Sequence, residues 1–485
     1  MKIISKITTR EKTTGRVYTP DYIVRNVLDM SGYYGNTILQ KHAIDNSCGD
    51  GAFLVEMVHR YCSAAKDKGL STEEISDQLG KFIHGIEIDN LECEKCITNV
   101  TQTAAQYGVY HVKWDIQCND AMLVRDYDGK MDFVLGNPPY VRVHNAGESL
   151  KTMKSFTFAQ NGMTDLYIVF FELGLRMVNS KGVLGYITPS SYFNSVAGEE
   201  MRRQFIRHSL VEKVIDLKHY QAFAATTYTA ITILKKHRTD DHVSYYQFDG
   251  KNKIPYYVDT LTPDDFFINN NFYFASKKKL QLLKKIFYNI GHCNILVRNG
   301  YATLCDPVYV GDFRFKSKYI IPAIKASTGR RTSIFFPYDR NSKLVSETEL
   351  KQDTELYCYL LTHKELLAKR SRENREHNLW YAYGRSQAIK DTYRNKISIN
   401  ALLRSVEDLK IIEAPAGTGV YGGLYIVGEG ASLENIKKIL FDEEFISYVS
   451  LLGKYKSGGY YTFSSKDLKA FLDYKLAYEG GLLAL

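Results

Sequence analysis

The chain has 485 residues, which is too long for one ordinary hydrophobic core, so we expect at least two domains. Hydrophobic residues make up 45% and charged residues 24%, a balance typical of globular proteins that excludes a largely disordered chain. The net charge of +9 suits a polyanionic partner without requiring one. The N-terminus carries no apolar signal-like segment, and no run of about 18 apolar residues occurs, so we expect no membrane association and a cytoplasmic location.

The eight cysteines are scattered, and Cys93 and Cys96 form the only CxxC pair. A zinc site would need a second pair, and a thioredoxin-type site would need the pair to open a helix after a strand. Neither context is present, so these cysteines are expected to pack in the core of a protein from a reducing compartment, and no metal site is predicted.

Short apolar runs alternate with amphipathic stretches between residues 41 and 236. This alternation predicts an α/β domain over residues 1–240, with a Rossmann-like, mainly parallel sheet that binds ligands at the carboxyl ends of its strands. Helices are expected from the turn after residue 45 to Tyr61 and over residues 166–178. The predicted strands are residues 42–45, 82–88, 112–116, 131–135, 182–188, 214–217 and 230–234.

The rest of the chain has a different pattern. Residues 241–285 begin with a charged stretch and become rich in Tyr, Phe and Asn, so we expect an ordered connector that packs on another part of the protein. Residues 286–485 show short β-like runs, glycine turns and a charged helix from His363 to about Arg375. This half is predicted to be a second domain of mixed α+β structure.

Three acidic positions follow predicted strands of the first domain. Asp45 opens the sequence Asp-Asn-Ser-Cys-Gly-Asp-Gly, in which Gly49 and Gly51 allow a ligand to approach the backbone closely. Glu87 ends the second strand, where a carboxylate can accept from both ribose hydroxyls of a nucleoside, and Asp120 follows the third. Each position taken alone is equally consistent with a ligand-free turn or a solvated strand end.

The sequence Asn-Pro-Pro-Tyr at residues 137–140 directly follows the apolar run 131–135. The exocyclic amine of adenine is a poor nucleophile because its lone pair is delocalised into the ring. The side-chain oxygen of Asn137 and a backbone carbonyl can both accept from this amine, which favours a pyramidal nitrogen with its lone pair directed at a methyl donor. Proline supplies a carbonyl without a competing donor, and Tyr140 can stack on a base removed from a duplex.

In these motifs, residues 14–236 resemble the gamma-class adenine-N6 DNA methyltransferases of restriction–modification systems. That class has its cofactor motifs first, then Asn-Pro-Pro-Tyr, then a target-recognition domain, and the same order holds here. The resemblance implies S-adenosylmethionine as the methyl donor, no metal, and direct in-line transfer to N6 of a flipped adenine in double-stranded DNA. No Pro-Cys nucleophile motif of a cytosine-C5 enzyme is present.

The resemblance also assigns residues. It places Thr19 near the methionine part of the donor, Glu87 on the ribose, Ile88 beside the adenine ring and Asp120 near the adenine amine of the donor. The expected cofactor-binding residues are Thr19, Asp45, Gly49, Gly51, Glu87, Ile88, Asp120 and Phe170. The expected catalytic residues are Asn137, Pro138, Pro139, Tyr140 and Phe223, the last on the other face of the flipped base. Asp50 departs from the proline or alanine often found at its position.

Two clusters of basic and aromatic residues occupy the second half, at residues 364–385 and 454–461. Lysines and arginines neutralise phosphates, and arginines can read guanine edges. Each cluster alone is more often a solvated face. Because both follow an amino-methyltransferase motif, they also resemble a target-recognition domain, although this resemblance is looser than that of the catalytic motifs. The candidate DNA-binding residues are Arg370, Arg372, Arg375, Trp380, Tyr383, Arg385, Lys454 and Lys456, with Arg385 expected to read a base.

Several alternatives stay open. Cytosine-N4 methylation uses the same amine chemistry, although its motif more often begins with Ser. Glutamine-amide methylation of release factors shares Asn-Pro-Pro-Tyr, but those chains end soon after the catalytic domain. A DNA-binding module with a vestigial methylase would lack donor binding. A fused nuclease is not expected because the first cofactor motif begins near residue 14, whereas a separate cognate restriction endonuclease is left open as a partner. We expect a monomer.

Overall fold

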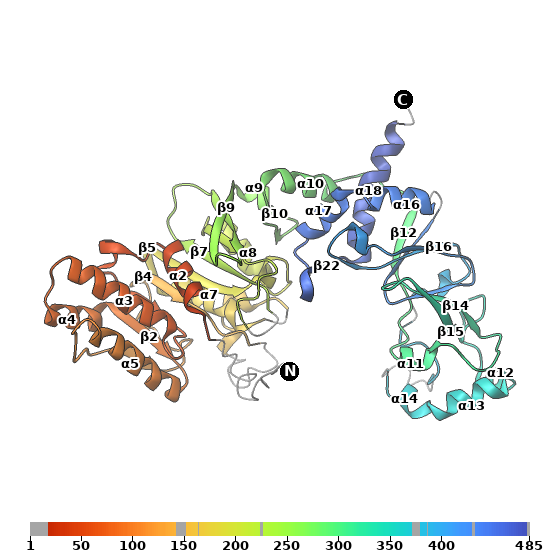
Figure 1. Cartoon of the computed structure of the whole chain (residues 1–485), viewed down its shortest axis with the longest axis horizontal. Helices are drawn as coiled ribbons and strands as arrows, with labels where there is room; N and C mark the ends of the chain where they lie inside the picture. The colour runs from red at the N-terminus through yellow and green to blue at the C-terminus, as the bar shows by residue number, and fades with distance from the viewer. Residues whose placement is uncertain are drawn as a thin grey trace. The chain divides into compact units, whose positions relative to one another are not determined.

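The computed structural model describes residues 18–141, 152–162, 164–223, 227–370, 379–385, 387–428 and 432–482. The chain divides into two compact units, residues 1–281 and residues 282–485 (Figure 1). Each unit buries its own cluster of hydrophobic side chains, as expected of separate domains.

Unit 1 is built on a nine-stranded sheet with the order β3-β2-β1-β4-β5-β7-β6-β8-β9. Five of its eight strand pairings are parallel, so the prediction of a mainly parallel α/β sheet is confirmed. The chain order reverses between β1 and β4, which leaves a crevice at their carboxyl ends. The strands are β1 (Ala43–Asp45), β2 (Ile83–Glu87), β3 (Asp115–Cys118), β4 (Met131–Gly136), β5 (Val178–Pro189), β6 (Val211–Asp216), β7 (Thr229–Lys235), β8 (Val243–Asp249) and β9 (Ile254–Leu261).

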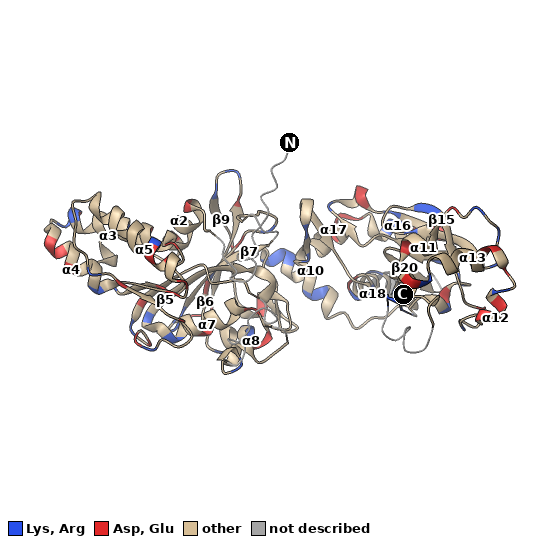
Figure 2. Ribbon diagram, turned by 90° about the horizontal axis from the view of Figure 1, so that it is seen from below, with Lys and Arg blue, Asp and Glu red and all other residues tan. Residues whose placement is uncertain are grey.

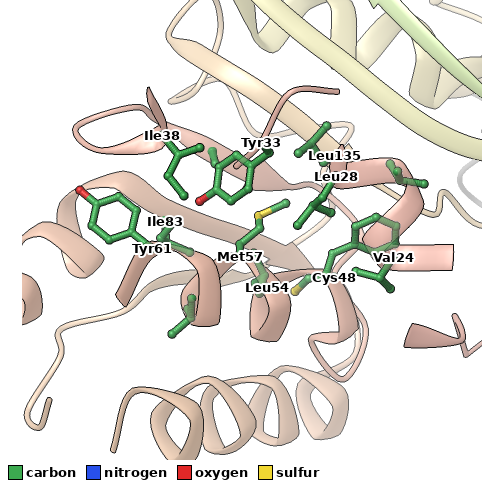
Figure 3. Packing of buried hydrophobic residues seen from close by; sticks show 14 of the residues in the cluster. Val24, Leu28, Tyr33, Ile38, Cys48, Leu54, Met57, Tyr61, Ile83 and Leu135 are labelled. Atoms are coloured by element: carbon green, nitrogen blue, oxygen red, sulfur yellow. The ribbon is translucent and has the colours of Figure 1, made fainter. Parts of the chain in front are cut away.

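Helices cover both faces of this sheet, which is why its central strands are apolar in sequence. Figure 3 shows the core formed on one face by side chains from the helices and strands around β1. On β5, alternate residues point to opposite faces. Tyr186 contacts Phe171 of α7, and Ile187 belongs to the hydrophobic cluster on the other face. The main helices are α2 (Asp21–Met30), α3 (Ala52–Asp67), α4 (Thr72–Phe82), α5 (Asn90–Ala105), α7 (Leu166–Met177) and α8 (Glu199–Arg207).

The segment expected to be a connector contributes strands to the sheet instead. Strand β8 pairs with β6, and β9 pairs with β8. The side-chain Nδ2 of Asn26 in α2 donates to the carbonyl of Lys253 in the β8–β9 turn, at 2.9 Å. Tyr245 of β8 is buried and Tyr246 is half-buried, whereas Tyr256 and Tyr257 of β9 are both exposed, so the aromatic richness reflects strands that are only partly buried. A short helix and hairpin follow, α9 (Pro263–Phe266), β10 (Phe267–Ile268) and β11 (Asn271–Phe272), and then α10 (Lys277–Phe287).

In its described residues, unit 2 contains three small sheets and several helices, in agreement with the predicted mixed α+β structure. One sheet is β12 (Ile295–Asn299), β20 (Leu424–Gly428), β16 (Lys396–Ile399) and β18 (Ile411–Ala414). The second is β13 (Val310–Gly311), β15 (Arg330–Phe335), β14 (Ile320–Lys325) and β19 (Gly419–Tyr421), and the third is β17 (Leu402–Leu403), β22 (Tyr460–Thr462) and β21 (Tyr455–Lys456).

The helices of unit 2 are short except at the end of the chain. The charged helix expected from His363 to about Arg375 is only α14 (Lys364–Ala368), and residues 371–378 lie outside the described residues. The others are α11 (Asp306–Tyr309), α12 (Glu347–Leu350), α13 (Thr354–Thr362), α16 (Leu433–Leu440), α17 (Glu443–Leu451) and α18 (Ser465–Leu482).

Candidate active site

A cavity of about 290 Å³ lies at the carboxyl ends of β1, β2 and β4 in unit 1. Residues as distant in sequence as Thr19 and Phe170 meet there, because parallel strands place their carboxyl ends at one edge of a sheet. Nine residues expected at the site line this cavity: Thr19, Asp45, Gly49, Glu87, Ile88, Asp120, Asn137, Pro139 and Phe170.

The glycine turn between β1 and α3 has two different functions. Gly49 has a φ of +53° and lines the cavity, and its backbone N–H points at Glu87. Gly51 has a φ of +97° at the start of α3 but is not among the lining residues. A Cβ on Gly51 would lie 2.8 Å from the Sγ of Cys96. Gly51 therefore allows α3 and α5 to pack closely, and its role in binding a ligand stays a prediction.

Glu87 is held in place by two backbone donors. Its Oε2 accepts from the N–H of Gly49 at 2.9 Å, and its Oε1 accepts from the N–H of Asp89 at 2.9 Å. Each carboxylate oxygen keeps a further lone pair for a ligand hydroxyl. The next residue, Ile88, is an apolar side chain exposed by 68% and lines the cavity beside Glu87. A polar group and an apolar surface thus lie side by side, as a nucleoside requires.

Asp45 is a buried carboxylate at the end of β1. Its Oδ1 accepts from the N–H of Ser47 at 3.0 Å, but burial dominates and raises the pKa of Asp45 from 3.8 to about 7. The neighbouring strand makes room for it, because a Cβ on Gly136 would lie 2.6 Å from Oδ1 of Asp45. The carboxylate therefore depends on a glycine placed immediately before Asn137.

The motif at residues 137–140 begins where β4 ends. The Nδ2 of Asn137 donates to Oγ1 of Thr19 at 3.0 Å, which orients the amide. Asn137 and Pro139 line the cavity, while Pro138 is buried beside them. Two predicted site segments that are more than 100 residues apart in sequence therefore meet through this one hydrogen bond.

Tyr140 lies on the other side of the motif among aromatic rings. Its hydroxyl donates to the carbonyl of Ile187 at 3.2 Å. The ring centroids of Tyr140 and Phe223 are 6.2 Å apart with an interplanar angle of 79°, and Tyr167 makes a similar edge contact at 6.3 Å. The two aromatic residues expected to enclose a base are thus brought together, but in edge contact. A base entering between them would have to displace Phe223.

Several cavity residues were not expected from the sequence. Asp89 carries the most recognisable signal, because its Oδ1 caps α5 by accepting from the N–H groups of Leu91 and Glu92. The others are ordinary polar or apolar residues next to the motifs, so only their neighbours could have indicated them: Tyr18, Asn46, Ser47, Cys48, Asp50, Ala52, Phe53, Ile86, Glu92, Asn119, Ala121, Met122 and Leu166.

The aromatic residues expected to bind DNA belong to the core of unit 2. Trp380 is 2% exposed and Tyr383 is 3% exposed. The hydroxyl of Tyr383 donates to the carbonyl of Phe335 at 2.7 Å. The basic residues on either side of this segment made these rings look like a stacking surface, but both side chains are buried in the hydrophobic cluster and cannot contact a base there.

Arg370 was also expected to bind DNA, and it has a structural role instead. Its guanidinium donates to the carbonyls of Thr303, Trp380 and Ala382 and to the hydroxyl of Tyr309, and so holds the chain segments of the core together. Lys454 is paired with Asp467 at 2.5 Å. Arg385 and Lys456 are exposed, and Arg372 and Arg375 lie outside the described residues.

The described cysteines pack without pairing. Cys93 and Cys96 are both buried on α5, and all eight cysteines are free. Within the described residues, no cluster of three or more His, Cys, Asp or Glu side chains could hold a metal ion. None of the helices in the described ranges is long and apolar enough to cross a membrane.

Part of unit 1 is similar to a known family of restriction-modification methylases. The model of the Eco57I restriction-modification methylase family matches residues 54–223. That range contains the glutamate of the cavity, the Asn-Pro-Pro-Tyr motif and Phe223. This segment of the chain is therefore similar to that family. The resemblance to restriction–modification methyltransferases is therefore confirmed.

Named relatives extend the similarity. The Type II methyltransferase M.BstVI of Geobacillus stearothermophilus is 31% identical over 47% of this chain and 43% of its own length. The Type II restriction enzyme and methyltransferase RM.Eco57I of Escherichia coli is 22% identical over 92% of this chain and 56% of its own length. The chain thus spans about half the length of these two curated relatives.

A solved structure shares the fold across both units. The Type IIL restriction-modification enzyme MmeI, described in complex with DNA, aligns with 95% of this chain and 72% of its own, with a TM-score of 0.58 and 12% identity. At this low sequence identity, the alignment shows only that the overall fold is similar.

Proposed function

We propose that the chain is a DNA methyltransferase that transfers a methyl group from S-adenosylmethionine to N6 of a flipped adenine in a specific duplex sequence. The observation that carries the proposal is the position of Asn137. It lines the cavity that also holds Glu87 and Ile88, and its motif continues to Tyr140 beside Phe223. A site for a nucleoside-containing donor and a site for a flat base therefore lie on the two sides of one tetrapeptide.

The residues of the cavity fit S-adenosylmethionine. Glu87, fixed by two backbone donors, would accept from the ribose hydroxyls, with the adenine ring of the donor against Ile88 and Phe170. Gly49 leaves the backbone open to the ligand, and Thr19, which lines the same cavity, would contact the methionine part. Asp120 lines the same cavity and would accept from the adenine amine. When bound, the donor supplies an electrophilic methyl group on sulfur.

The chain's own residues would activate the amine by accepting hydrogen bonds. The side-chain oxygen of Asn137 and the carbonyl of Pro138 would both accept from the exocyclic amine, which directs the nitrogen lone pair toward the methyl group. Thr19 keeps the amide of Asn137 in the orientation that presents its oxygen. Tyr140 would stack on the flipped base. The aromatic pocket would hold the base away from water and so favour in-line transfer.

Unit 2 is the proposed source of DNA recognition. A catalytic pocket for one extruded base cannot read its neighbours, so sequence must be read through the grooves by other surfaces. The described complex of MmeI with DNA supports this assignment, because its fold resembles both units of this chain. A separate cognate endonuclease is a further proposal, in keeping with relatives named Type II methyltransferases.

Single-molecule sequencing of DNA from cells that express the chain tests this function. We expect N6-methyladenine at one short sequence, and none in cells that express the Asn137→Ala variant. If N4-methylcytosine were found instead, the methylated base would be cytosine and not adenine. Donor binding by the purified protein without methylation of any DNA would contradict the proposed activity.

A further inference from the structure

A pair of tyrosines joins two segments of unit 1 that are distant in sequence. Tyr22 lies in the first turn of α2, three residues after Thr19. Tyr220 lies in the connection between β6 and β7, three residues before Phe223. One hydroxyl donates to the other across 2.9 Å, and the two rings are in edge contact with their centroids 6.3 Å apart. The hydrogen bond therefore links the segment next to the donor cavity to the segment that carries Phe223.

The ring of Tyr220 is also held by the hairpin that β8 and β9 form. Its centroid lies 4.9 Å from that of Phe248 on β8. A Cβ added to Gly250, in the turn of the hairpin, would lie only 2.4 Å from Cδ2 of Tyr220. The ring thus lies directly against the backbone of this glycine, and a larger residue at position 250 would displace it.

The same hairpin is bonded to α2. The buried Asn26 uses its Nδ2 to donate both to the carbonyl of Tyr22, at 2.7 Å, and to the carbonyl of Lys253 in the hairpin turn, at 2.9 Å. The Nζ of Lys253 lies over the ring of Tyr22, 4.7 Å from its centroid. Figure 2 shows β9 beside α2, in agreement with the direct contacts between these two elements. The helix, the hairpin and the β6–β7 connection therefore meet at the tyrosine pair.

The tyrosine pair completes a closed circuit of contacts through both sides of the candidate site. Three of its links are side-chain contacts: the 3.0 Å hydrogen bond from the motif amide to the threonine, the 2.9 Å hydrogen bond between the tyrosines, and the 6.2 Å edge contact between the two rings of the base site. The other three links are stretches of chain that each join residues three positions apart. In order, the members are Asn137, Thr19, Tyr22, Tyr220, Phe223 and Tyr140.

A site for a flipped base requires accurate placement of Phe223. Its side chain is buried and lies edge-on to Tyr140, so the ring must move to admit a base and must then cover the face of that base. Stacking depends on the position of the ring, because the aromatic face has to overlap the base. An anchor three residues earlier in the chain allows the ring to move while its backbone stays within reach of Tyr140.

We propose that Tyr220, through its hydrogen bond to Tyr22, is a positioning residue that holds the segment before Phe223 so that this ring can cover the flipped base. The proposal rests on the proposed function, because only an enzyme that acts on an extruded base has a base to cover. Tyr220 is not among the residues that line the donor cavity, so it acts through Phe223 and not on the donor. The hairpin of β8 and β9 thereby supports the base site as well as the sheet.

Single-turnover methylation by the whole chain tests the proposal on two substrates. One is a duplex with the sequence that is methylated in cells, and the other is the same duplex with a mismatch opposite the target adenine. A paired base must be unpaired and unstacked before transfer, whereas a mismatched base has already lost part of that cost. Tyr220→Phe keeps the ring but removes the hydrogen bond, so it should slow transfer on the paired duplex by roughly three- to tenfold. On the mismatched duplex the loss should be about twofold or less, because extrusion is easier there.

Two further variants act on the same contact from other sides. Tyr22→Phe removes the same hydrogen bond and should have the same effect as Tyr220→Phe. The double variant should be no slower than either single variant, because one interaction can be lost only once. Gly250→Ala places a Cβ against the ring of Tyr220 and should also slow transfer more on the paired duplex than on the mismatched one.

Tyr107→Phe provides a matched control. Tyr107 is another half-buried tyrosine of unit 1, and its hydroxyl is hydrogen-bonded to Nδ1 of His59 on α3 at 2.7 Å. Neither residue lines the donor cavity. This variant should keep the wild-type rate on both duplexes. Because Tyr107→Phe and Tyr220→Phe each lose one hydrogen bond, their thermal unfolding should change by similar small amounts, and calorimetry should show wild-type donor affinity in both.

The outcomes separate this proposal from the proposed function. Equal losses on the paired and mismatched duplexes would overturn it, because the hydrogen bond would then support the fold or the transfer step and not the capture of the base. A wild-type rate in Tyr220→Phe would also overturn it, as would losses that add in the double variant. A wild-type protein that binds donor but methylates no duplex would contradict the proposed function itself, and the base site with it.

Discussion

At the scale of single residues, a substitution of Asn137 should slow methyl transfer without weakening donor binding. Asn137→Ala removes one acceptor for the amine and should raise the barrier by about 2.7–4 kcal/mol, the range found for similar preorganised polar groups. Thr19→Val should lower the rate by a smaller factor, because it removes only the hydrogen bond that orients the amide. Single-turnover methylation measures both effects, and calorimetry should show nearly unchanged donor affinity for Asn137→Ala. Turnover close to the wild-type rate would contradict the assignment.

Glu87 should determine donor affinity. Glu87→Ala removes the acceptor for the ribose hydroxyls and should weaken donor binding by about 1.5–3 kcal/mol. It also leaves the N–H groups of Gly49 and Asp89 without their carboxylate, so stability must be measured alongside. Glu87→Gln keeps one carbonyl acceptor and should have an intermediate affinity. Isothermal calorimetry checks the order, and equal affinities in all three proteins would mean that Glu87 does not contact the donor.

Asp45 should make the stability of unit 1 depend on pH. Its pKa is about 7 in the folded chain and 3.8 when unperturbed, so between these values the folded state keeps a proton that the unfolded state has lost. Stability should therefore fall as pH rises from about 4 to 7, by up to roughly 4 kcal/mol, and level off above 7. Asp45→Asn should remove this dependence and be more stable than wild type at pH 8.

Donor binding should follow the opposite trend at Asp45. A cationic donor favours the charged carboxylate, so donor affinity should rise as pH approaches 7 from below. In Asp45→Asn this rise should disappear, and affinity should be lower at pH 8 although the protein is more stable. Calorimetry and thermal unfolding at pH 5 and 8 measure both quantities. A parallel change in stability and affinity would show that Asp45 acts only through folding.

At the scale of secondary-structure elements, the sequence was most informative where both faces of a strand are buried. Strands β1, β2, β4 and β5 are nearly continuous apolar runs that end in polar motifs, so both the strands and the site at their ends could be predicted. Strands β8 and β9 are half exposed and contain tyrosines at positions of both kinds. Their pattern alone could not show that they extend the sheet.

Three of the predicted DNA-binding residues, Trp380, Tyr383 and Arg370, are enclosed in the core of unit 2 for a related reason. Trp380 and Tyr383 lie in the basic, aromatic segment 364–385, yet tertiary packing buries both, and Arg370 is enclosed by backbone carbonyls. Composition indicates that a segment is basic and aromatic, but it does not show which side chains the fold turns inward.

Gly136 tests how an element positions the site. Gly136→Ala would place a Cβ 2.6 Å from Oδ1 of Asp45, and must shift either that carboxylate or the end of β4 that carries Asn137. We expect weaker donor binding and slower methylation together. Gly129→Ala is the control, because its left-handed backbone costs stability, roughly 1–2 kcal/mol, but no atom lies within 4 Å of the added Cβ. Unchanged donor affinity in Gly136→Ala would show that the contact is easily relieved.

At the scale of the whole molecule, the boundary between the two units falls later than sequence composition suggested. Composition changes near residue 240, but the sheet continues through β9, and the first unit extends to Gln281. A chain cut at residue 240 would lose β8 and expose the edge of β6 that it covers. It would also lose buried side chains of β8, including Val243 and Tyr245. An exposed edge of this kind promotes aggregation.

This boundary leads to a prediction about the division of labour between the units. A fragment of residues 1–281 should fold, remain soluble and bind the donor with wild-type affinity, because the cavity and its supporting strands lie within it. A fragment of residues 1–240 should aggregate on gel filtration. With unit 2 absent, the longer fragment should methylate DNA weakly and without preference for one sequence, since groove contacts are lost. Sequencing of DNA treated with the folded fragment measures this preference. Methylation confined to one short sequence would place recognition in unit 1 and remove that role from unit 2.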